Sequence, residues 1–372
     1  MSSSSGLMAS LSSSSSARLT SIVSHLSAGD VRPKVVICRH LGPAMPSLLE
    51  RNDIDIVLWP EDRTCERAWL LENVKGAAGV LVLLGDRVNE ELLEAAGPKL
   101  RVVSTMSVGY EHIDLPLMAK HNIRVGYTPD VLTEAVADIS VMLALMAGRN
   151  DGVAYSIVKN GGWSSFAWSP FTFCGPQLSA TASSPTRTVG FLGFGRIAQA
   201  TLARLVPFGI THCIYTGSPN SRPDTTRDAA LQAKHNLKVL ERVDADRLAR
   251  ESDVLFVLTP GGQETYHLVD AAFLKKMKKM SVLVNTSRGS VVDSDALATA
   301  LREKWIWGAG LDVVEGEPAI STDHPLVKEP QCVMVPHIGS ATFQTRLDMA
   351  TRAIDNLIGG LFGGEMPAEV GK

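Results

Sequence analysis

The sequence lacks the features that would assign it to a membrane, to nucleic acid or to an oxidising compartment. None of its 372 residues lies in an apolar run approaching the ~20 residues that span a bilayer. A net charge of −3 at pH 7 provides no electrostatic case for a nucleic-acid or anionic-membrane partner. The five cysteines are scattered without a C-x-x-C pair, which argues against zinc and against a disulfide framework. We therefore expect an intracellular protein with reduced thiols and no metal.

Acidic residues are absent from the first 29 residues, which are rich in serine and contain Arg18 and His25. This composition is typical of a disordered tail, and it also has the character of an organellar transit peptide. The apolar stretch near Leu7 is too short for a secretory signal. We predict that residues 1–33 form a tail or targeting segment. A cytoplasmic location is expected, with the mitochondrion or another organelle as the alternative.

What the sequence does contain is two successive α/β series. Short, nearly continuous apolar runs bounded by turn residues are typical of buried parallel strands. They occur at 35–37, 80–84, 101–105 and 123–125, and again at 189–192, 212–216, 253–258, 282–285, 310–314 and 333–335. Helical spacing occurs at 90–96, 197–205 and 295–301, with Asp295 as a possible cap, and in a long helix from 132 to 148 with Thr133 as its N-cap. The sequence predicts two α/β domains, each with a doubly wound parallel sheet.

A glycine-rich turn opens the second series. The segment Val189–Ala198 fits G-x-G-x-x-G/A, with Gly193, Gly195 and Ala198 at the three positions. The first glycine permits a tight turn, the second lets the backbone approach a pyrophosphate, and the third position keeps the helix close to the strand. A predicted strand precedes the motif and a predicted helix follows it, as dinucleotide binding requires.

The end of the next strand bears on the choice of dinucleotide. An acidic residue about 20 positions after the motif would hold the ribose 2′-hydroxyl of NAD. Here Gly217 stands in that region, and no acid follows before Asp224. The residues between them can donate hydrogen bonds or supply charge, namely Ser218, Asn220, Ser221 and Arg222. We therefore favour NADPH as cofactor, with NADH as the alternative.

Three polar segments follow predicted strands of the second series, where open α/β sheets place their sites. They contain Arg288, Glu317 and His337. Reduction of a keto acid needs a cation to bind the carboxylate and polarise the carbonyl, and an acid to protonate the oxygen. A carboxylate beside a histidine would keep that acid protonated and oriented. Arg288, His337 and Glu317 fit these three roles, although each alone could be structural.

These segments, in this order after the glycine-rich turn, resemble the D-isomer-specific 2-hydroxyacid dehydrogenase family. The resemblance extends from about Lys34 to Val370 and is greatest to the glyoxylate reductase/hydroxypyruvate reductase group. It is supported by the stretches 106–109, 124–133, 159–163, 215–217 and 336–342.

The resemblance implies two Rossmann-like domains with the active site in the cleft between them. One is a split substrate domain over residues 34–131 and 336–372, and the other is a dinucleotide-binding domain over 132–335. It implies that Val108 and Gly109 offer backbone N–H groups to the substrate carboxylate, with Arg288 and His337 also binding substrate. The cofactor would contact the backbone at Gly193, Gly195, Arg196 and Ile197, the loop from Gly217 to Arg222, and Thr286, Asp312 and Gly339. It further implies a homodimer in which the aromatic stretch 161–175 reaches over the partner, with Phe166 or Trp168 near the neighbouring active site.

The sequence departs from its relatives at two places. Ala198 stands where glycine is commoner, and Ser218 stands where the NADP-using relatives tend to have arginine. The alternatives are another D-2-hydroxyacid dehydrogenase, such as a phosphoglycerate dehydrogenase, and a corepressor-like dinucleotide sensor. Because only a few residues follow Met366, a phosphoglycerate dehydrogenase with an added regulatory domain after the core is disfavoured. Gly217 disfavours the sensor, whose relatives have an acid at that strand end.

Overall fold

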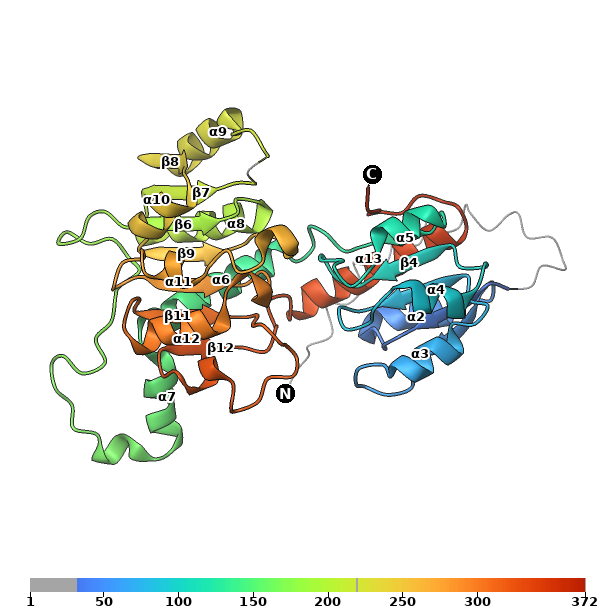
Figure 1. The fold of residues 1–372 in the computed structure, drawn as a ribbon, viewed down its shortest axis with the longest axis horizontal. Helices are drawn as coiled ribbons and strands as arrows, with labels where there is room; N and C mark the ends of the chain where they lie inside the picture. The colour runs from blue at the N-terminus through green and yellow to red at the C-terminus, as the bar shows by residue number, and fades with distance from the viewer. Residues whose placement is uncertain (1–31, 219, 372) are drawn as a thin grey trace, which may run out of the picture.

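Two parallel sheets, each with apolar clusters on both faces, make up the protein (Figure 1). The computed structural model describes residues 32–218 and 220–371. The tail or targeting segment predicted for residues 1–33 therefore lies almost entirely outside the described residues. Within the described residues, no helix has the length and apolar character needed to cross a membrane.

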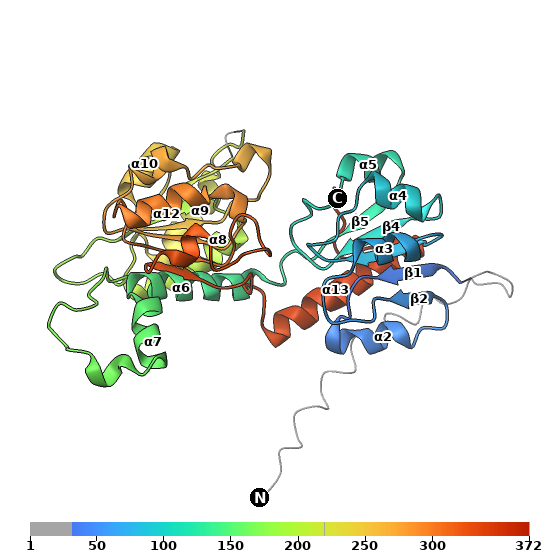
Figure 2. The ribbon, with the colours of Figure 1, turned by 60° about the horizontal axis from the view of Figure 1, so that its bottom comes forward.

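The smaller sheet is built mainly from the first third of the chain. Its order is β2-β1-β3-β4-β5, and all its strands are parallel. A helix from the other end of the chain, α13 (Phe343–Leu361), packs against β3, β4 and β5 (Figures 1 and 2). The strands are β1 (Lys34–Ile37), β2 (Asp55–Leu58), β3 (Gly79–Val82), β4 (Val102–Thr105) and β5 (Arg124–Gly126). The remaining helices are α2 (Met45–Leu49), α3 (Arg67–Asn73), α4 (Glu90–Ala96) and α5 (Leu115–Lys120).

The larger sheet has the order β12-β11-β10-β9-β6-β7-β8, again all parallel. The strand order reverses between β6 and β9, and such switch points are where open α/β sheets bind ligands. Its strands are β6 (Thr188–Leu192), β7 (His212–Thr216), β8 (Val239–Arg242), β9 (Val254–Val257), β10 (Val282–Asn285), β11 (Gly308–Leu311) and β12 (Cys332–Met334). Its helices are α6 (Thr133–Gly148), α8 (Arg196–Leu205), α9 (Thr225–His235), α10 (Ala245–Glu251), α11 (Ala271–Leu274) and α12 (Ser294–Arg302). The prediction of two Rossmann-like, doubly wound α/β units is confirmed.

A projecting segment follows α6. Helix α7 (Asp151–Lys159) and the 3₁₀ turn η3 (Gly162–Ser165) extend away from the body of the larger sheet (Figures 1 and 2). Trp168 and Phe171 in this segment are 77% and 88% exposed. The prediction that residues 161–175 follow neither strand nor α-helix periodicity is confirmed, and large aromatic surfaces are left facing solvent.

Two strands were missed by the sequence reasoning, and the end of a third was predicted wrongly. Strands β2 and β8 were not predicted, because Asp55–Leu58 and Val239–Arg242 lie at sheet edges and are only partly buried. Strand β11 ends at Leu311 rather than at residue 314, which leaves Asp312 in the following loop.

Two predicted helix caps are also wrong. Leu132 precedes α6 without a side-chain cap, and Thr133 is already the first helical residue. Helix α12 is capped by Asp293, whose carboxylate accepts the Ala296 N–H at 2.9 Å, and not by Asp295. An aspartate two positions earlier is an equally good cap, so composition alone did not separate the two.

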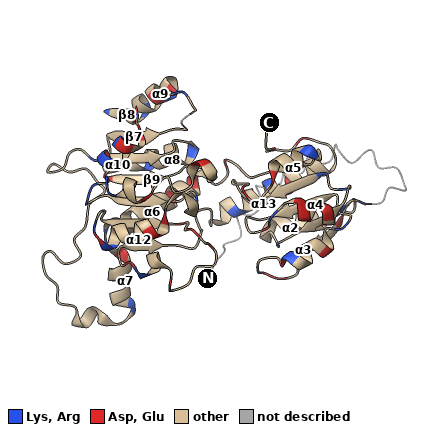
Figure 3. Cartoon of the chain, in the orientation of Figure 1, with Lys and Arg blue, Asp and Glu red and all other residues tan. Residues whose placement is uncertain are grey.

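An apolar cluster joins the two sheet units. Val136 of α6 and Met349 of α13 belong to it, together with Val108 of the smaller unit and Ile197 of α8. Lys and Arg are interspersed with Asp and Glu over both units in the view of Figure 3.

Candidate active site

The glycine-rich turn has the conformation that its residues predict. Gly193 has φ +90°, and a Cβ there would lie 2.9 Å from the carbonyl oxygen of Leu258. Gly195 precedes α8, and a Cβ built on it would meet no atom within 4 Å. Ala198 is fully buried against the sheet. The turn therefore leaves open space at the N-terminus of a ten-residue helix, and this fits a dinucleotide pyrophosphate.

The next two residues of this turn link it to the smaller unit. Arg196 forms an ion pair with Asp130, which precedes α6, and both side chains are at least half exposed. Ile197 packs into the cluster that contains Val108. The glycine-rich turn and the loop after β4 are thus held close together, although about 90 residues separate them in sequence.

At the end of β7, the loop is organised by an arginine that the sequence reasoning did not identify. Arg242, the last residue of β8, donates from Nη2 to the Ser218 carbonyl and from Nη1 to the Ser221 carbonyl, each at 2.7 Å. The Ser221 hydroxyl also donates to the Ser218 carbonyl, at 2.9 Å. Asn220 and Arg222 are exposed on the same loop.

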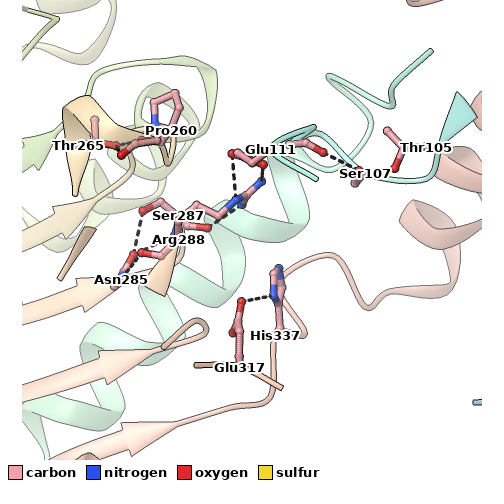
Figure 4. A network of polar contacts seen from close by, with 12 residues as sticks. Thr105, Ser107, Glu111, Pro260, Thr265, Asn285, Ser287, Arg288, Glu317 and His337 are labelled. Carbon is pink, nitrogen blue, oxygen red and sulfur yellow. Dashed lines mark hydrogen bonds and ion pairs between the residues drawn. The ribbon is translucent and has the colours of Figure 1, made fainter. Parts of the chain in front are cut away.

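Arg288 follows β10 in a turn shaped by a buried asparagine. The Asn285 side chain accepts from the Ser287 N–H at 3.0 Å and donates to the Arg288 carbonyl at 2.9 Å. The Arg288 guanidinium reaches the smaller unit, where its Nε lies 3.2 Å from a carboxylate oxygen of Glu111 (Figure 4). A Cβ on Gly109 would lie only 1.7 Å from Arg288 Nη2, so a side chain at position 109 would displace the guanidinium from this place.

The loop that contains Gly109 is held by a chain of hydroxyl groups. Ser107 Oγ donates to the Gly109 carbonyl at 2.6 Å, and it lies 2.7 Å from Thr105 Oγ1. Thr105 Oγ1 in turn lies 3.0 Å from Nε2 of His112. Burial, assisted by the positive charge of Arg288, lowers the pKa of His112 to about 4. His112 is therefore neutral at physiological pH and acts as a fixed hydrogen-bonding partner of Thr105.

His337 and Glu317 form a direct pair. Nδ1 of His337 lies 2.9 Å from a carboxylate oxygen of Glu317, and both side chains are about one-third exposed. A carboxylate on Nδ1 fixes the proton there and leaves Nε2 as the working nitrogen. In Figure 4 the His337 ring points toward the side on which Arg288 and Glu111 lie.

Asp312 supports the loop that presents His337. Its two carboxylate oxygens accept the N–H groups of Ile338 at 2.6 Å and Gly339 at 2.9 Å. Burial raises the pKa of Asp312, and these two N–H donors act in the opposite direction. Thr286 is also buried, and its hydroxyl lies 2.8 Å from that of Ser140 on α6. Among the described residues, no cluster of three or more His, Cys, Asp or Glu could hold a metal ion.

Comparison with known proteins identifies the family. A model for the D-isomer specific 2-hydroxyacid dehydrogenase NAD-binding domain matches residues 141–339. Glyoxylate reductase/hydroxypyruvate reductase of Mus musculus is 43% identical over 324 residues, covering 87% of this chain and 93% of that protein. The chain belongs to the D-isomer specific 2-hydroxyacid dehydrogenase family. It is thus an oxidoreductase that uses a nicotinamide dinucleotide as cofactor.

Other members of this dehydrogenase family agree in sequence and fold. Glyoxylate reductase of Thermofilum pendens is 40% identical over 92% of this chain and 95% of its own length. A crystal structure of an NADPH-dependent glyoxylate/hydroxypyruvate reductase from Sinorhizobium meliloti, in complex with NADP and malonate, has a TM-score of 0.74 to this chain. That structure is 30% identical, and the match covers 92% of this chain and 97% of the other.

The structure brings together some of the predicted site residues and adds others. Arg288 lies against Gly109, and His337 lies against Glu317. Glu111 was missed, although it follows the end of β4, where a strand-end rule applies. Arg242 was missed because its strand was not predicted.

Proposed function

We propose that this dehydrogenase reduces glyoxylate and hydroxypyruvate to glycolate and D-glycerate, with NADPH as its preferred hydride donor. The choice of substrates is supported by relatives that are 40–43% identical to this chain. These relatives are a glyoxylate reductase and a glyoxylate reductase/hydroxypyruvate reductase. One structural observation carries the proposal. The Arg288 guanidinium lies against the Gly109 backbone, while the His337–Glu317 pair faces the same region (Figure 4).

The proposed substrate site uses the two units together. The N–H groups of Val108 and Gly109 and the Arg288 guanidinium would bind the carboxylate of the keto acid, and Arg288 would also polarise its carbonyl. A planar guanidinium suits this role because it can donate two parallel hydrogen bonds to a carboxylate. In the absence of substrate, the Glu111 carboxylate forms an ion pair with the Arg288 guanidinium. Substrate would therefore replace one carboxylate partner of Arg288 by another.

The proposed proton donor is His337, through Nε2. When bound, the reduced nicotinamide supplies a hydride to the carbonyl carbon. The carbonyl oxygen then takes the Nε2 proton, and neutral His337 is reprotonated from solvent. Glu317 stabilises the imidazolium through Nδ1 and fixes the orientation of the ring. Arg288 stabilises the negative charge that develops on the oxygen before it is protonated.

The proposed cofactor site lies at the switch point of the larger sheet. Backbone groups at Gly193, Gly195, Arg196 and Ile197 would hold the pyrophosphate. Thr286 and Gly339 would lie near the nicotinamide, with Asp312 holding the Gly339 backbone in place. The loop from Gly217 to Arg222, with Ser218, Asn220 and Ser221, would surround the adenine ribose. The absence of an acid at Gly217 supports NADPH, as does the NADPH-dependent relative.

The proposed domain division is a substrate domain over residues 34–131 and 336–372 and a dinucleotide-binding domain over 132–335. The packing of α13 against β3, β4 and β5 supports assigning the C-terminal segment to the first.

The proposed assembly is a homodimer. Trp163, Trp168 and Phe171 are exposed on the projecting segment, and clustered exposed aromatics mark association surfaces. Phe166 stacks on Phe173 within the chain, with ring centroids 5.3 Å apart, which favours Trp168 as the aromatic that reaches the neighbouring active site.

The test is loss of reduced-cofactor absorbance with glyoxylate or hydroxypyruvate, using NADPH and NADH in turn. Rapid turnover with NADPH is expected. Turnover of 3-phosphohydroxypyruvate in preference to both would instead favour a phosphoglycerate dehydrogenase. Cofactor binding without turnover of any keto acid would favour the dinucleotide-sensing scaffold.

A further inference from the structure

We propose that Arg242 is the residue that recognises the 2′-phosphate of NADPH. The inference rests on the proposed cofactor preference, and it names the side chain responsible. Arg242 lies on β8, 24 residues after Ser218 in the sequence, and its guanidinium contacts the Ser218 carbonyl. An arginine from the neighbouring strand thus occupies the region that a side chain at the end of β7 would otherwise fill.

The position of the guanidinium supports this role. In Rossmann-like domains, the residue that distinguishes NAD from NADP lies at the end of the second strand, beside the ribose. Here that strand is β7, and Gly217 follows it directly. A Cβ on Gly217 would lie 3.0 Å from Cζ of Arg242 and 3.2 Å from its Nε. The guanidinium is therefore placed where an acidic side chain would hold the 2′-hydroxyl of NAD.

Arg242 is held in place but is not neutralised. Its two carbonyl contacts, to Ser218 and Ser221, fix the guanidinium and use two of its five N–H donors. No carboxylate among the described residues lies within ion-pair distance of it. A fixed, uncompensated guanidinium with donors to spare is suited to bind a phosphate.

The other arginines near this loop are less suited. Arg227 stacks on Phe194 and Tyr215, and its charge is compensated by Asp228 at 2.6 Å. Arg222 is exposed, and no described residue fixes its side chain. A control outside the proposed cofactor site is Arg250 of α10, an exposed arginine of the same unit that pairs with Asp246.

Replacing Arg242 by Gln removes the charge and keeps donor groups near the two carbonyls. Because hydrogen bonds to charged groups are strong, losing the charge is expected to weaken binding of the 2′-phosphate by about 10- to 100-fold. We expect R242Q to lower kcat/KM for NADPH by that factor and to leave kcat/KM for NADH within threefold. R250Q should leave the ratio of the two kcat/KM values within threefold. Equal losses with both cofactors would mean that Arg242 only shapes the loop, and would overturn the proposal.

A binding measurement separates this proposal from the proposed reaction. Calorimetry with adenosine 2′,5′-bisphosphate and with 5′-AMP tests recognition of the 2′-phosphate without any substrate. Wild-type protein should bind the bisphosphate more tightly, and R242Q should lose that difference. If the difference persists in R242Q or is also lost in R250Q, Arg242 is not the residue that recognises the 2′-phosphate. This holds even if the protein reduces neither glyoxylate nor hydroxypyruvate.

Discussion

Replacing Glu317 by Gln tests the proposed proton donor most directly. The exchange keeps a side-chain oxygen that can accept from Nδ1 of His337 but removes the negative charge. The two side chains lie 2.9 Å apart and are about one-third exposed. Hydrogen bonds to charged groups contribute ~1.5–3 kcal/mol, and partial exposure to water favours the lower end. A loss of ~1.5–2 kcal/mol from the transition state corresponds to about a 10- to 30-fold lower kcat.

The assay is steady-state reduction of hydroxypyruvate at saturating NADPH, with the dissociation constant of NADPH measured separately by fluorescence. We expect kcat to fall by that factor while the NADPH dissociation constant stays within twofold, because Glu317 acts on the imidazolium. Glu315→Gln is the matched control, since Glu315 lies on the same loop but pairs with His267 at 3.1 Å. A kcat within twofold of wild type for Glu317→Gln, or an equal loss in the control, would refute the role of Glu317.

Three further outcomes are expected. Arg288→Lys should lower kcat/KM for glyoxylate by about 100-fold, because a point charge does not reproduce a planar two-point contact; near-normal rates would contradict the proposed carboxylate contact. Glu111→Gln should lower KM for glyoxylate by up to about fivefold with kcat within twofold, because a partly exposed ion pair of ~0.2–1 kcal/mol no longer competes with substrate; a higher KM would show that Glu111 orients Arg288. His112 has a pKa of about 4 when folded and 6.5 in the reference state, so the unfolded chain binds more protons between these values. The free energy of unfolding should therefore fall by at most about 3 kcal/mol as the pH drops from 6.5 to 4, and His112→Gln should reduce this dependence in urea titrations; an unchanged dependence would exclude His112 as its source.

Most of the cofactor turn and the polar strand ends could be predicted from the sequence. A glycine with φ +90° at Gly193 and an apolar run before it are local requirements, so their pattern survives in the linear order of residues. The same is true of the strands that precede Arg288 and His337. Edge strands such as β8 have only partly buried residues, and no comparable pattern marks them.

The sequence by itself determined the two α/β series, the position of the dinucleotide turn and the residue types available for the chemistry. Only the tertiary structure decided which charges meet. Glu111 and Arg288 are 177 residues apart, and their contact depends on how the smaller unit lies against the larger sheet. Arg242 reaches Gly217 because β7 and β8 are neighbours in the sheet, with Tyr215 paired to Arg242 in register. Side-chain partners across strands and domains depend on three-dimensional packing, which no local pattern of residues encodes.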